Sequence, residues 1–150
     1  MDPGLPPEHS KGALKADMKV PEGYKTDPGF DPAEDHIGPF CYKEDGQGYC
    51  YAFRAGEQHC NAHGIVHGGV LMTFADYCLC MEATDHYKEE TCVTVSFNGE
   101  FVSAGKIGEL IECRAAVTRK TGSMAFVRGD VYAGDDVIFT FSSVVKRLRD

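Results

Sequence analysis

The 150-residue sequence predicts an α+β domain in which an antiparallel β-sheet wraps around one long central α-helix. Residues 68–84 carry apolar side chains at helical three-and-four spacing, with no second helix of that length. The chain after residue 90 alternates between apolar and polar residues in four segments joined by short turns. Because a lone apolar helix must bury its surface, we expect the sheet to wrap around it.

Composition and charge limit the classes of protein. Hydrophobic residues make up 43% of the chain and charged residues 25%, as expected for one globular domain. The net charge of -8 argues against a nucleic-acid partner, because phosphate binding needs a basic face. Seven cysteines without a secretory signal read as buried thiols, and no apolar run approaches the ~20 residues of a membrane span. We therefore expect a cytoplasmic protein without a membrane partner.

The first half of the chain divides into an extension and the start of the domain. Residues 1–35 are rich in Pro, Gly and charge and predict a partly irregular extension, with at most a short helix at 11–18. The domain spans residues 36–150. It begins with strands at 37–42 and 49–54, joined by a turn at 44–48. A polar, glycine-broken loop then leads to the helix.

The second half predicts an antiparallel meander. In the strand at 91–101, Val93, Val95 and Phe97 fall on one face and Thr94, Ser96 and Asn98 on the other. Three further strands follow after short turns, at residues 109–119, 123–133 and 136–148.

Two features at the helix point to chemistry. Gly68 and Gly69 stand at the helix start, where backbone N–H groups have no partner within the helix and can bind a developing oxyanion. Asp76 shares a helical face with apolar and thiol side chains. A desolvated carboxylate there can act as a base or a nucleophile. A tight turn at the glycines and a structural role for Asp76 are the alternatives.

Other polar residues near these positions are candidates for supporting roles. Asn61 and His67 flank the glycines and could orient a carbonyl group. Thr94 could position a water molecule. Four close residues raise the alternative of a zinc site, but their segment does not read as a helix and has no partner CxxC or HxxxH motif: His59, Cys60, His63 and His67. We therefore expect no metal.

The stretch "NAHGIVHGGVLMTFAD" resembles the signature of hotdog-fold acyl-CoA thioesterases of the phenylacetate-pathway (PaaI-like) type. The matching positions are Asn61, Gly64, His67, Gly68, Gly69 and Asp76. The similarity continues through "VTVSFNGEFVSAGKIGE" and covers roughly residues 36–148, while the first ~30 residues have no assigned counterpart.

The resemblance implies roles for individual residues. The Gly68 N–H would polarise the thioester carbonyl, Asp76 would act as nucleophile or general base, and Thr94 would help to hold the water. Coenzyme A contacts are implied at the turn "TRKTGS". The candidate residues for binding substrate and coenzyme A are Gly69, Ser96, Arg119, Lys120, Gly122, Ser123 and Arg147, of which Arg147 reads equally well as a solvated tail. No cofactor is expected, since coenzyme A is part of the substrate.

The predicted function is hydrolysis of an acyl-CoA or aryl-CoA thioester. An enoyl-CoA hydratase is less favoured because the helix lacks a paired Asp and His, and a non-catalytic acyl-CoA-binding protein is the other alternative. In a helix that starts at Gly68, Asp76 lies ~12 Å further along. A single thioester carbonyl cannot reach both groups of one helix, so a site that uses both needs two chains. We therefore expect a homodimer, and a dimer of dimers beyond it. The sequence does not predict the acyl or aryl preference.

Overall fold

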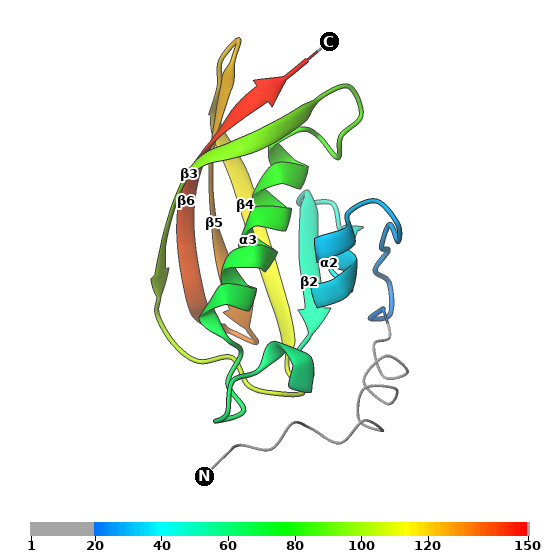
Figure 1. The fold of residues 1–150 in the computed structure, drawn as a ribbon, viewed down its shortest axis with the longest axis vertical. Coiled ribbons are helices and arrows are strands. Elements are labelled where there is room, and N and C mark those ends of the chain that lie inside the picture. Colours follow the sequence, from blue (N-terminus) through cyan, green and yellow to red (C-terminus); the bar gives the residue numbers. More distant parts are fainter. Residues whose placement is uncertain (1–19, 150) are drawn as a thin grey trace.

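The computed structural model of the protein describes residues 20–149, within which six strands form one antiparallel sheet (Figure 1). The strand order is β1-β2-β4-β5-β6-β3. The strands are β1 (Cys41–Glu44), β2 (Tyr49–Arg54), β3 (Thr91–Phe101), β4 (Leu110–Lys120), β5 (Met124–Ala133) and β6 (Asp136–Leu148). The helices are α2 (Pro32–Ile37) and α3 (Gly68–Ala83), with a 3-10 turn η1 (Glu57–His59). No helix in this part of the chain has the length and apolar character needed to cross a bilayer.

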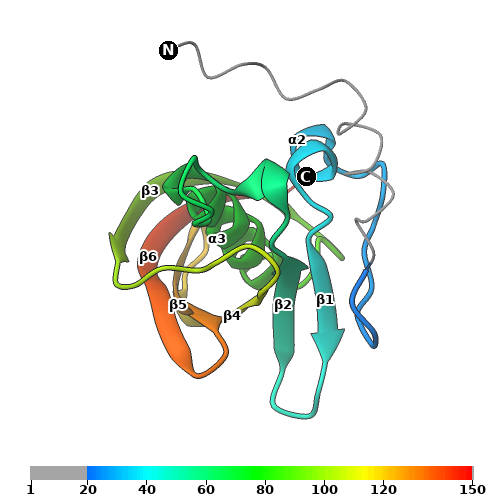
Figure 2. The ribbon, with the colours of Figure 1, turned by 90° about the horizontal axis from the view of Figure 1, so that it is seen from below.

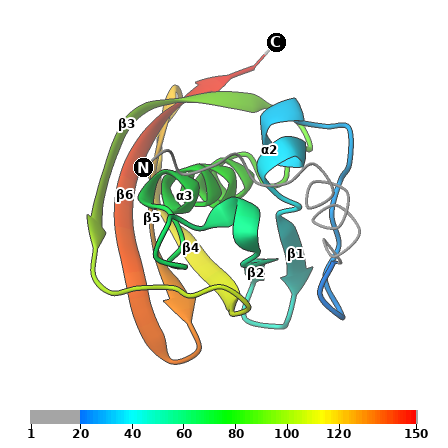
Figure 3. The ribbon, with the colours of Figure 1, turned by 60° about the horizontal axis from the view of Figure 1, so that its bottom comes forward.

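The sheet curves around α3, which confirms the predicted architecture (Figure 3). Nine of its side chains are buried, and they point in several directions around the helix axis because β3 to β6 enclose much of it: Leu71, Phe74, Ala75, Tyr77, Cys78, Leu79, Cys80, Met81 and Ala83. Met72 and Asp76 are exposed on the part of the helix that the sheet leaves uncovered. The core of the domain is therefore the space between α3 and the inner face of the sheet.

The segment before β1 differs from the sequence prediction. We expected a strand from Ile37, but residues Pro32–Ile37 form α2 and the first strand begins at Cys41. The Asp31 side chain accepts a hydrogen bond from the Glu34 N–H at 3.0 Å, and Pro32 occupies the first helical turn. These are helix-start signals, and they overrode the apolar run at 37–42. The short helix considered at 11–18 lies outside the described residues.

Residues that we assigned to the extension pack on the domain. Lys25 pairs with Tyr42 of β1 in an isolated bridge, and Figure 2 shows this segment running alongside β1. The Tyr24 hydroxyl donates to Glu112 of β4 at 3.1 Å. Further along the same segment, α2 contacts α3. The segment from residue 20 to β1 therefore packs on the domain and places α2 against α3.

Strand β3 contains a β-bulge that the sequence pattern did not reveal. Thr94 pairs with Val145 of β6 and Ser96 pairs with Val144, so Val95 is an extra residue. An extra residue exchanges the two faces of a strand beyond it. Thr94 is therefore half-buried before the bulge and Phe97 after it, whereas Val93 and Val95 are 47% and 54% exposed. The prediction that Val93, Val95 and Phe97 share one face is wrong.

Candidate active site

Asp76 and Thr94 form a hydrogen-bonded pair between α3 and β3. The Thr94 hydroxyl donates to Asp76 Oδ1 over 2.6 Å. The Cys80 thiol, one helical turn after Asp76, lies 3.9 Å from the same oxygen and 3.5 Å from the Thr94 hydroxyl. The bulge at Val95 permits the Thr94–Asp76 hydrogen bond, because it lets Thr94 face α3 while Phe97 still packs into the core.

The environment of Asp76 is wetter than the sequence indicated. The side chain is exposed in the single chain, so the prediction of a buried carboxylate is wrong for one copy alone. The reason is that the sheet ends at β3 and leaves this face of α3 open. Among the described residues, Asp76 forms no salt bridge with a cationic side chain. The carboxylate is therefore available to a ligand or to a second chain.

The start of α3 presents one unpaired backbone donor. His67 caps the helix, and its Nδ1 accepts a hydrogen bond from the Gly69 N–H at 2.9 Å. The Gly69 N–H, a predicted substrate contact, is therefore already engaged. Within residues 20–149, the Gly68 N–H has no acceptor. A Cβ at Gly68 would lie 3.0 Å from the Phe101 ring, so a larger side chain needs that ring to shift.

Asn61 shapes the loop that leads into α3. Its Oδ1 accepts from the N–H groups of His63, at 2.9 Å, and Ile65, at 3.3 Å. The His67 N–H donates to the His59 carbonyl at 2.8 Å, which ties the end of the loop to its beginning. Asn61, His67 and Gly68 thus belong to one structural unit, whereas Asp76 lies about 12 Å along the helix at 1.5 Å per residue.

Two of the four candidate zinc ligands have other roles, because the His67 ring caps α3 and the His59 ring is held inside the domain. His59 is buried; its Nδ1 accepts from the Gly56 N–H at 2.9 Å and its Nε2 lies 2.6 Å from the Ile37 carbonyl. Burial lowers the pKa of His59, which favours the neutral ring. The described part of the chain holds no group of three or more ligand-type side chains that could bind a metal ion.

The predicted coenzyme A residues around the β4–β5 turn surround a buried carboxylate. Glu90 has a side chain only 6% exposed, and three cations approach it: Lys120 at 3.1 Å, Arg147 at 3.0 Å and Arg149 at 3.8 Å. Burial alone would raise the pKa of Glu90, but hydrogen bonds from Arg147 and Lys120 bring it below its usual range. We call these four residues the Glu90 cluster. Arg147 is 14% exposed and also donates to the Thr121 carbonyl, so it is not a solvated tail.

Other predicted binding residues are spread over two faces of the sheet. Arg119 pairs with exposed Phe126 and Lys120 with buried Ala125, so the two cations point to opposite faces. Ser96 is exposed and lines an outer-face hollow that Phe126 also lines, away from Asp76.

The turn itself has fewer open donors than the sequence suggested. The Ser123 N–H donates to the Thr121 hydroxyl at 3.4 Å, and the Gly122 carbonyl accepts from Arg149. Lys120 lines the hollow that contains the Glu90 cluster, whereas Arg119 and the turn residues do not.

Glu34 is a site candidate that sequence reasoning missed. Burial raises the pKa of this α2 carboxyl to about 7, with further contributions from the charges of Asp31, Asp76 and Asp35. Its negative charge therefore interacts with that of Asp76. The residue was assigned to an irregular extension, although the capping pattern in "DPAED" could have placed it on a helix.

The comparisons with known proteins agree with this fold. Residues 63–140, just over half of the chain, match the model of the thioesterase superfamily. The chain has a hotdog fold and belongs to the thioesterase superfamily. It is a thioester hydrolase.

Individual relatives place the chain more closely. A candidate esterase of Pseudomonas aeruginosa, PA0474, is 32% identical over 129 residues, which is 85% of this chain and 96% of that protein. The PaaI protein of the Escherichia coli phenylacetic acid degradation operon has a TM-score of 0.70 at 16% identity, over 79% of this chain and 86% of that one. The Bacillus halodurans protein BH2602, solved with coenzyme A, has a TM-score of 0.71 at 19% identity, over 83% of each chain. The resemblance to hotdog-fold thioesterases is confirmed, and with the PaaI protein the chain shares the fold.

Proposed function

We propose that the protein hydrolyses an acyl-CoA or aryl-CoA thioester to the free acid and coenzyme A. The observation that carries this proposal is Asp76: an exposed carboxylate on the central helix, paired with the Thr94 hydroxyl at 2.6 Å. Coenzyme A enters because BH2602, which shares the fold, was solved with it. The operon of the E. coli PaaI protein supports including aryl groups in the proposal.

The proposed chemistry uses two groups of opposite polarity. A backbone N–H that lacks an acceptor, as at Gly68, stabilises the negative charge that develops on the thioester oxygen. Asp76 acts either as a general base that takes a proton from water or as a nucleophile on the carbonyl carbon. In both routes the C–S bond breaks and the coenzyme A thiolate leaves and takes up a proton. In the nucleophilic route, water then hydrolyses the anhydride formed between the acyl group and Asp76, which releases the free acid and restores the carboxylate. Thr94 orients Asp76.

The two groups require two chains. Attack needs reacting atoms about 3–3.5 Å apart, whereas Gly68 and Asp76 of one helix are about 12 Å apart. We propose a homodimer in which Asn61, His67 and Gly68 of one chain meet Asp76 and Thr94 of the other, with two such dimers in a tetramer. The edge strand β3 and neighbouring residues expose apolar side chains that a second copy would cover: Met72, Val93, Val95, Phe101 and Val102.

The Glu90 cluster borders the proposed binding site for the coenzyme A phosphates. Lys120 is 36% exposed and Arg149 is 50% exposed, so both retain surface that a phosphate can reach. The Gly122 backbone on the adjoining turn is also exposed. Arg147 is more enclosed, and its role in this proposal is to hold Glu90 and the turn.

A subunit-exchange experiment tests the site. Asp76→Asn and Gly68→Pro chains, each inactive alone toward a panel of acyl-CoA and aryl-CoA substrates, are mixed and allowed to re-pair. Proline fits the first turn of a helix but lacks the N–H, which makes the substitution specific. Half of the dimers are then mixed and each has one intact site, so thiol release should return to roughly a quarter of the wild-type rate.

Controls separate the parts of the proposal. Gly68→Ala meets the same Phe101 ring as Gly68→Pro but keeps the N–H, so it should retain more activity. Verified exchange without recovered activity would show that each site lies within one chain. A wild-type protein that releases no thiol from any substrate of the panel would refute the proposed coenzyme A thioester substrate.

A further inference from the structure

Helix α3 and strand β3 bring two thiols together beside the Asp76–Thr94 pair. Cys80 lies one helical turn after Asp76, and its Sγ is 3.5 Å from the Thr94 hydroxyl and 3.9 Å from Asp76 Oδ1. Cys92 stands two positions before Thr94 in β3 and ahead of the bulge, so alternation places both on the same half-buried face. From that face Cys92 packs against the core and hydrogen-bonds to the Cys80 thiol.

The surroundings give the two thiols different reactivity. The hydrogen bond to Cys92 and burial raise the pKa of Cys80, so this thiol stays protonated. The same hydrogen bond lowers the pKa of Cys92, and the nearby charge of Lys120 acts in the same direction. Burial and the charges of Asp76 and Glu90 oppose this effect without cancelling it. Cys92 is therefore the thiol that reacts as a thiolate, with a protonated thiol in contact with it.

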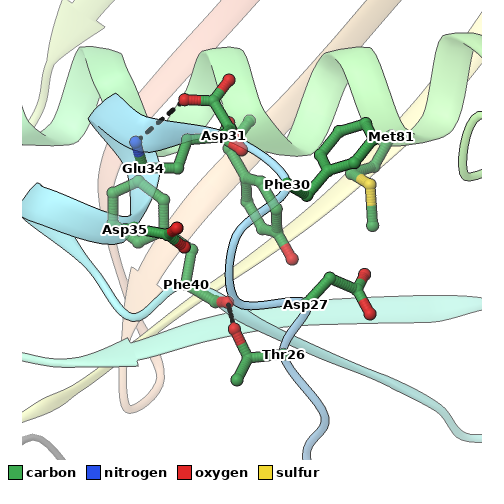
Figure 4. Close-up of a pocket in the computed structure, with 9 residues that line it drawn as sticks. Thr26, Asp27, Phe30, Asp31, Glu34, Asp35, Phe40 and Met81 are labelled. Atoms are coloured by element: carbon green, nitrogen blue, oxygen red, sulfur yellow. Dashed lines mark hydrogen bonds between the residues drawn. The ribbon is translucent and has the colours of Figure 1, made fainter.

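Tyr87 covers the Cys80 side of the pair. Its hydroxyl hydrogen-bonds with the Cys80 thiol, and its ring packs on Phe30 with the ring centroids 5.0 Å apart. Phe30 in turn lines the small pocket between α2 and α3 (Figure 4). Cys80 is 9% exposed, whereas Cys92 is only half-buried. A small solute therefore reaches the pair at Cys92.

A second thiol pair in the same helix provides an internal comparison. Cys78 of α3 hydrogen-bonds to Cys113 of β4, and both side chains are fully buried. Burial raises the pKa of Cys78. Thiol oxidation requires thiolate character and access to the oxidant, and this core pair has neither. The pair beside Asp76 has both.

We propose that Cys80 and Cys92 form a peroxide-sensitive dithiol that reversibly lowers the activity of the Asp76 site. The Cys92 thiolate attacks one oxygen of hydrogen peroxide, the O–O bond breaks, hydroxide leaves and Cys92 becomes a sulfenic acid. The Cys80 thiol then attacks this sulfur. The S–S bond forms, and the sulfenic hydroxyl leaves as water with the thiol proton. The two sulfurs lose the electron pair that reduces the peroxide, and a dithiol reductant restores both thiols.

The disulfide changes the surroundings of the reacting carboxylate, and this step rests on the proposed thioester hydrolysis. Oxidised Cys80 has no S–H and can no longer donate to Asp76 Oδ1. The crosslink also fixes α3 to β3 beside the Thr94 hydroxyl. Because a thiol is a weak donor, we expect kcat to fall about three- to tenfold and to recover on reduction.

Oxidation of the full-length protein tests the proposal. The protein is treated with hydrogen peroxide, the peroxide is removed, remaining thiols are alkylated after unfolding, and the peptides are mapped by mass spectrometry. We expect a disulfide between Cys80 and Cys92, with Cys78 and Cys113 still reduced. In parallel, kcat is measured before oxidation, after oxidation and after dithiothreitol. Loss of thioester absorbance is followed, because a reagent that captures thiols would react with the cysteines.

Variants identify the responsible thiol, each compared with its own untreated sample. Cys92→Ser removes the attacking thiolate, so its kcat should not respond to peroxide. Cys60→Ser removes another half-buried cysteine, whose pKa is raised by burial, and it should lose activity to the same extent as the wild type.

The outcomes separate the dithiol from the proposed function. Absence of the Cys80–Cys92 disulfide, or equal peroxide sensitivity in Cys92→Ser, would refute the dithiol and leave the thioesterase proposal intact. A mapped disulfide with unchanged kcat would refute its control of activity. Failure of the reduced protein to cleave any coenzyme A ester would overturn the proposed function, and peptide mapping would still decide whether the dithiol exists.

Discussion

Two carboxylate regions of this molecule are built in opposite ways. Glu90 is almost fully buried, and Lys120, Arg147 and Arg149 surround it. Asp76, on the exposed side of α3, accepts a hydrogen bond from the Thr94 hydroxyl, and among the described residues neither Asp76 nor Glu34 pairs with a cation. Burial acts on both glutamates in the same direction, yet the pKa of Glu90 is lowered and that of Glu34 is raised. Neighbouring charge therefore decides which carboxylate stabilises the fold and which remains available for chemistry.

The largest expected effect separates the two regions by activity. Asp76→Asn should lower kcat by about 10²-fold or more, because it removes the charge while keeping the shape of the side chain. Glu90→Gln should leave kcat within a few-fold of the wild type. Steady-state thiol release measures both. A kcat unchanged in Asp76→Asn would remove this residue from the mechanism.

The second largest expected effect is on stability, and it distinguishes the Glu90 cluster from the region around Asp76. Glu90→Gln should lower the free energy of unfolding by about 2 kcal/mol at pH 7, a buried-pair value reduced because two of the three cations are partly exposed. A lowered pKa contributes stability that is fully present above the unfolded value of about 4.3 and is lost as pH falls through the lower folded value. Urea unfolding should therefore show a larger difference between variant and wild type at pH 7 than at pH 3.5. An equal difference at both values would mean that the cluster acts through packing.

A smaller effect of opposite sign is expected at Glu34. Its raised pKa means that the neutral carboxyl contributes stability at low pH, which is lost as pH rises through about 7. Glu34→Gln never ionises, so at pH 8 it should be more stable than the wild type by about 1 kcal/mol after discounting for solvent screening, or about 2–4 °C in Tm. At pH 4 the two should melt together. Calorimetry that shows Glu34→Gln less stable at pH 8 would place an unrecognised cation beside Glu34.

The smallest effect asks whether the Glu90 cluster also binds coenzyme A. Replacing Arg119 and Lys120 together by Ala should raise KM about three- to tenfold with less effect on kcat, because phosphate contacts are equal in ground and transition states. Lys120 belongs to the Glu90 cluster and Arg119 does not, so Lys120→Ala should account for most of the change. The wild-type KM should also rise with salt. A KM indifferent to both changes would leave the cluster with a structural role alone.

The sequence predicted the parts of the molecule that depend on local pattern. The helix at Gly68–Ala83 and the three strands after β3 follow from spacing and short turns. Asp76 and Thr94 were both selected, and they do meet. Asp76 was expected to be buried, however, because helical spacing identifies neighbours on the helix and not where the sheet ends.

The features that the sequence did not predict depend on contacts between distant segments. The Arg147–Glu90 pair joins residues 57 positions apart, and nothing in either local pattern specifies the partner. The bulge at Val95 leaves no mark in an alternating sequence, because either phase reads as a valid strand. Helix α2 was missed although Asp31 and Pro32 signal its start, since a six-residue helix has too little periodicity to outweigh an apolar run.

The bulge in β3 has a consequence for how this strand can change during evolution. Its first half aims a hydroxyl at Asp76 and its second half aims Phe97 into the core, and the extra residue Val95 sets the phase between them. Deletion of one residue would restore regular alternation and turn one of the two side chains outward. Substitutions at position 94 can therefore alter reactivity without disturbing the core. Deletion of one residue, in contrast, would remove either the hydroxyl beside Asp76 or the packing of Phe97. Positions 94 and 97 therefore constrain each other through the number of residues between them, although their side chains do not need to touch.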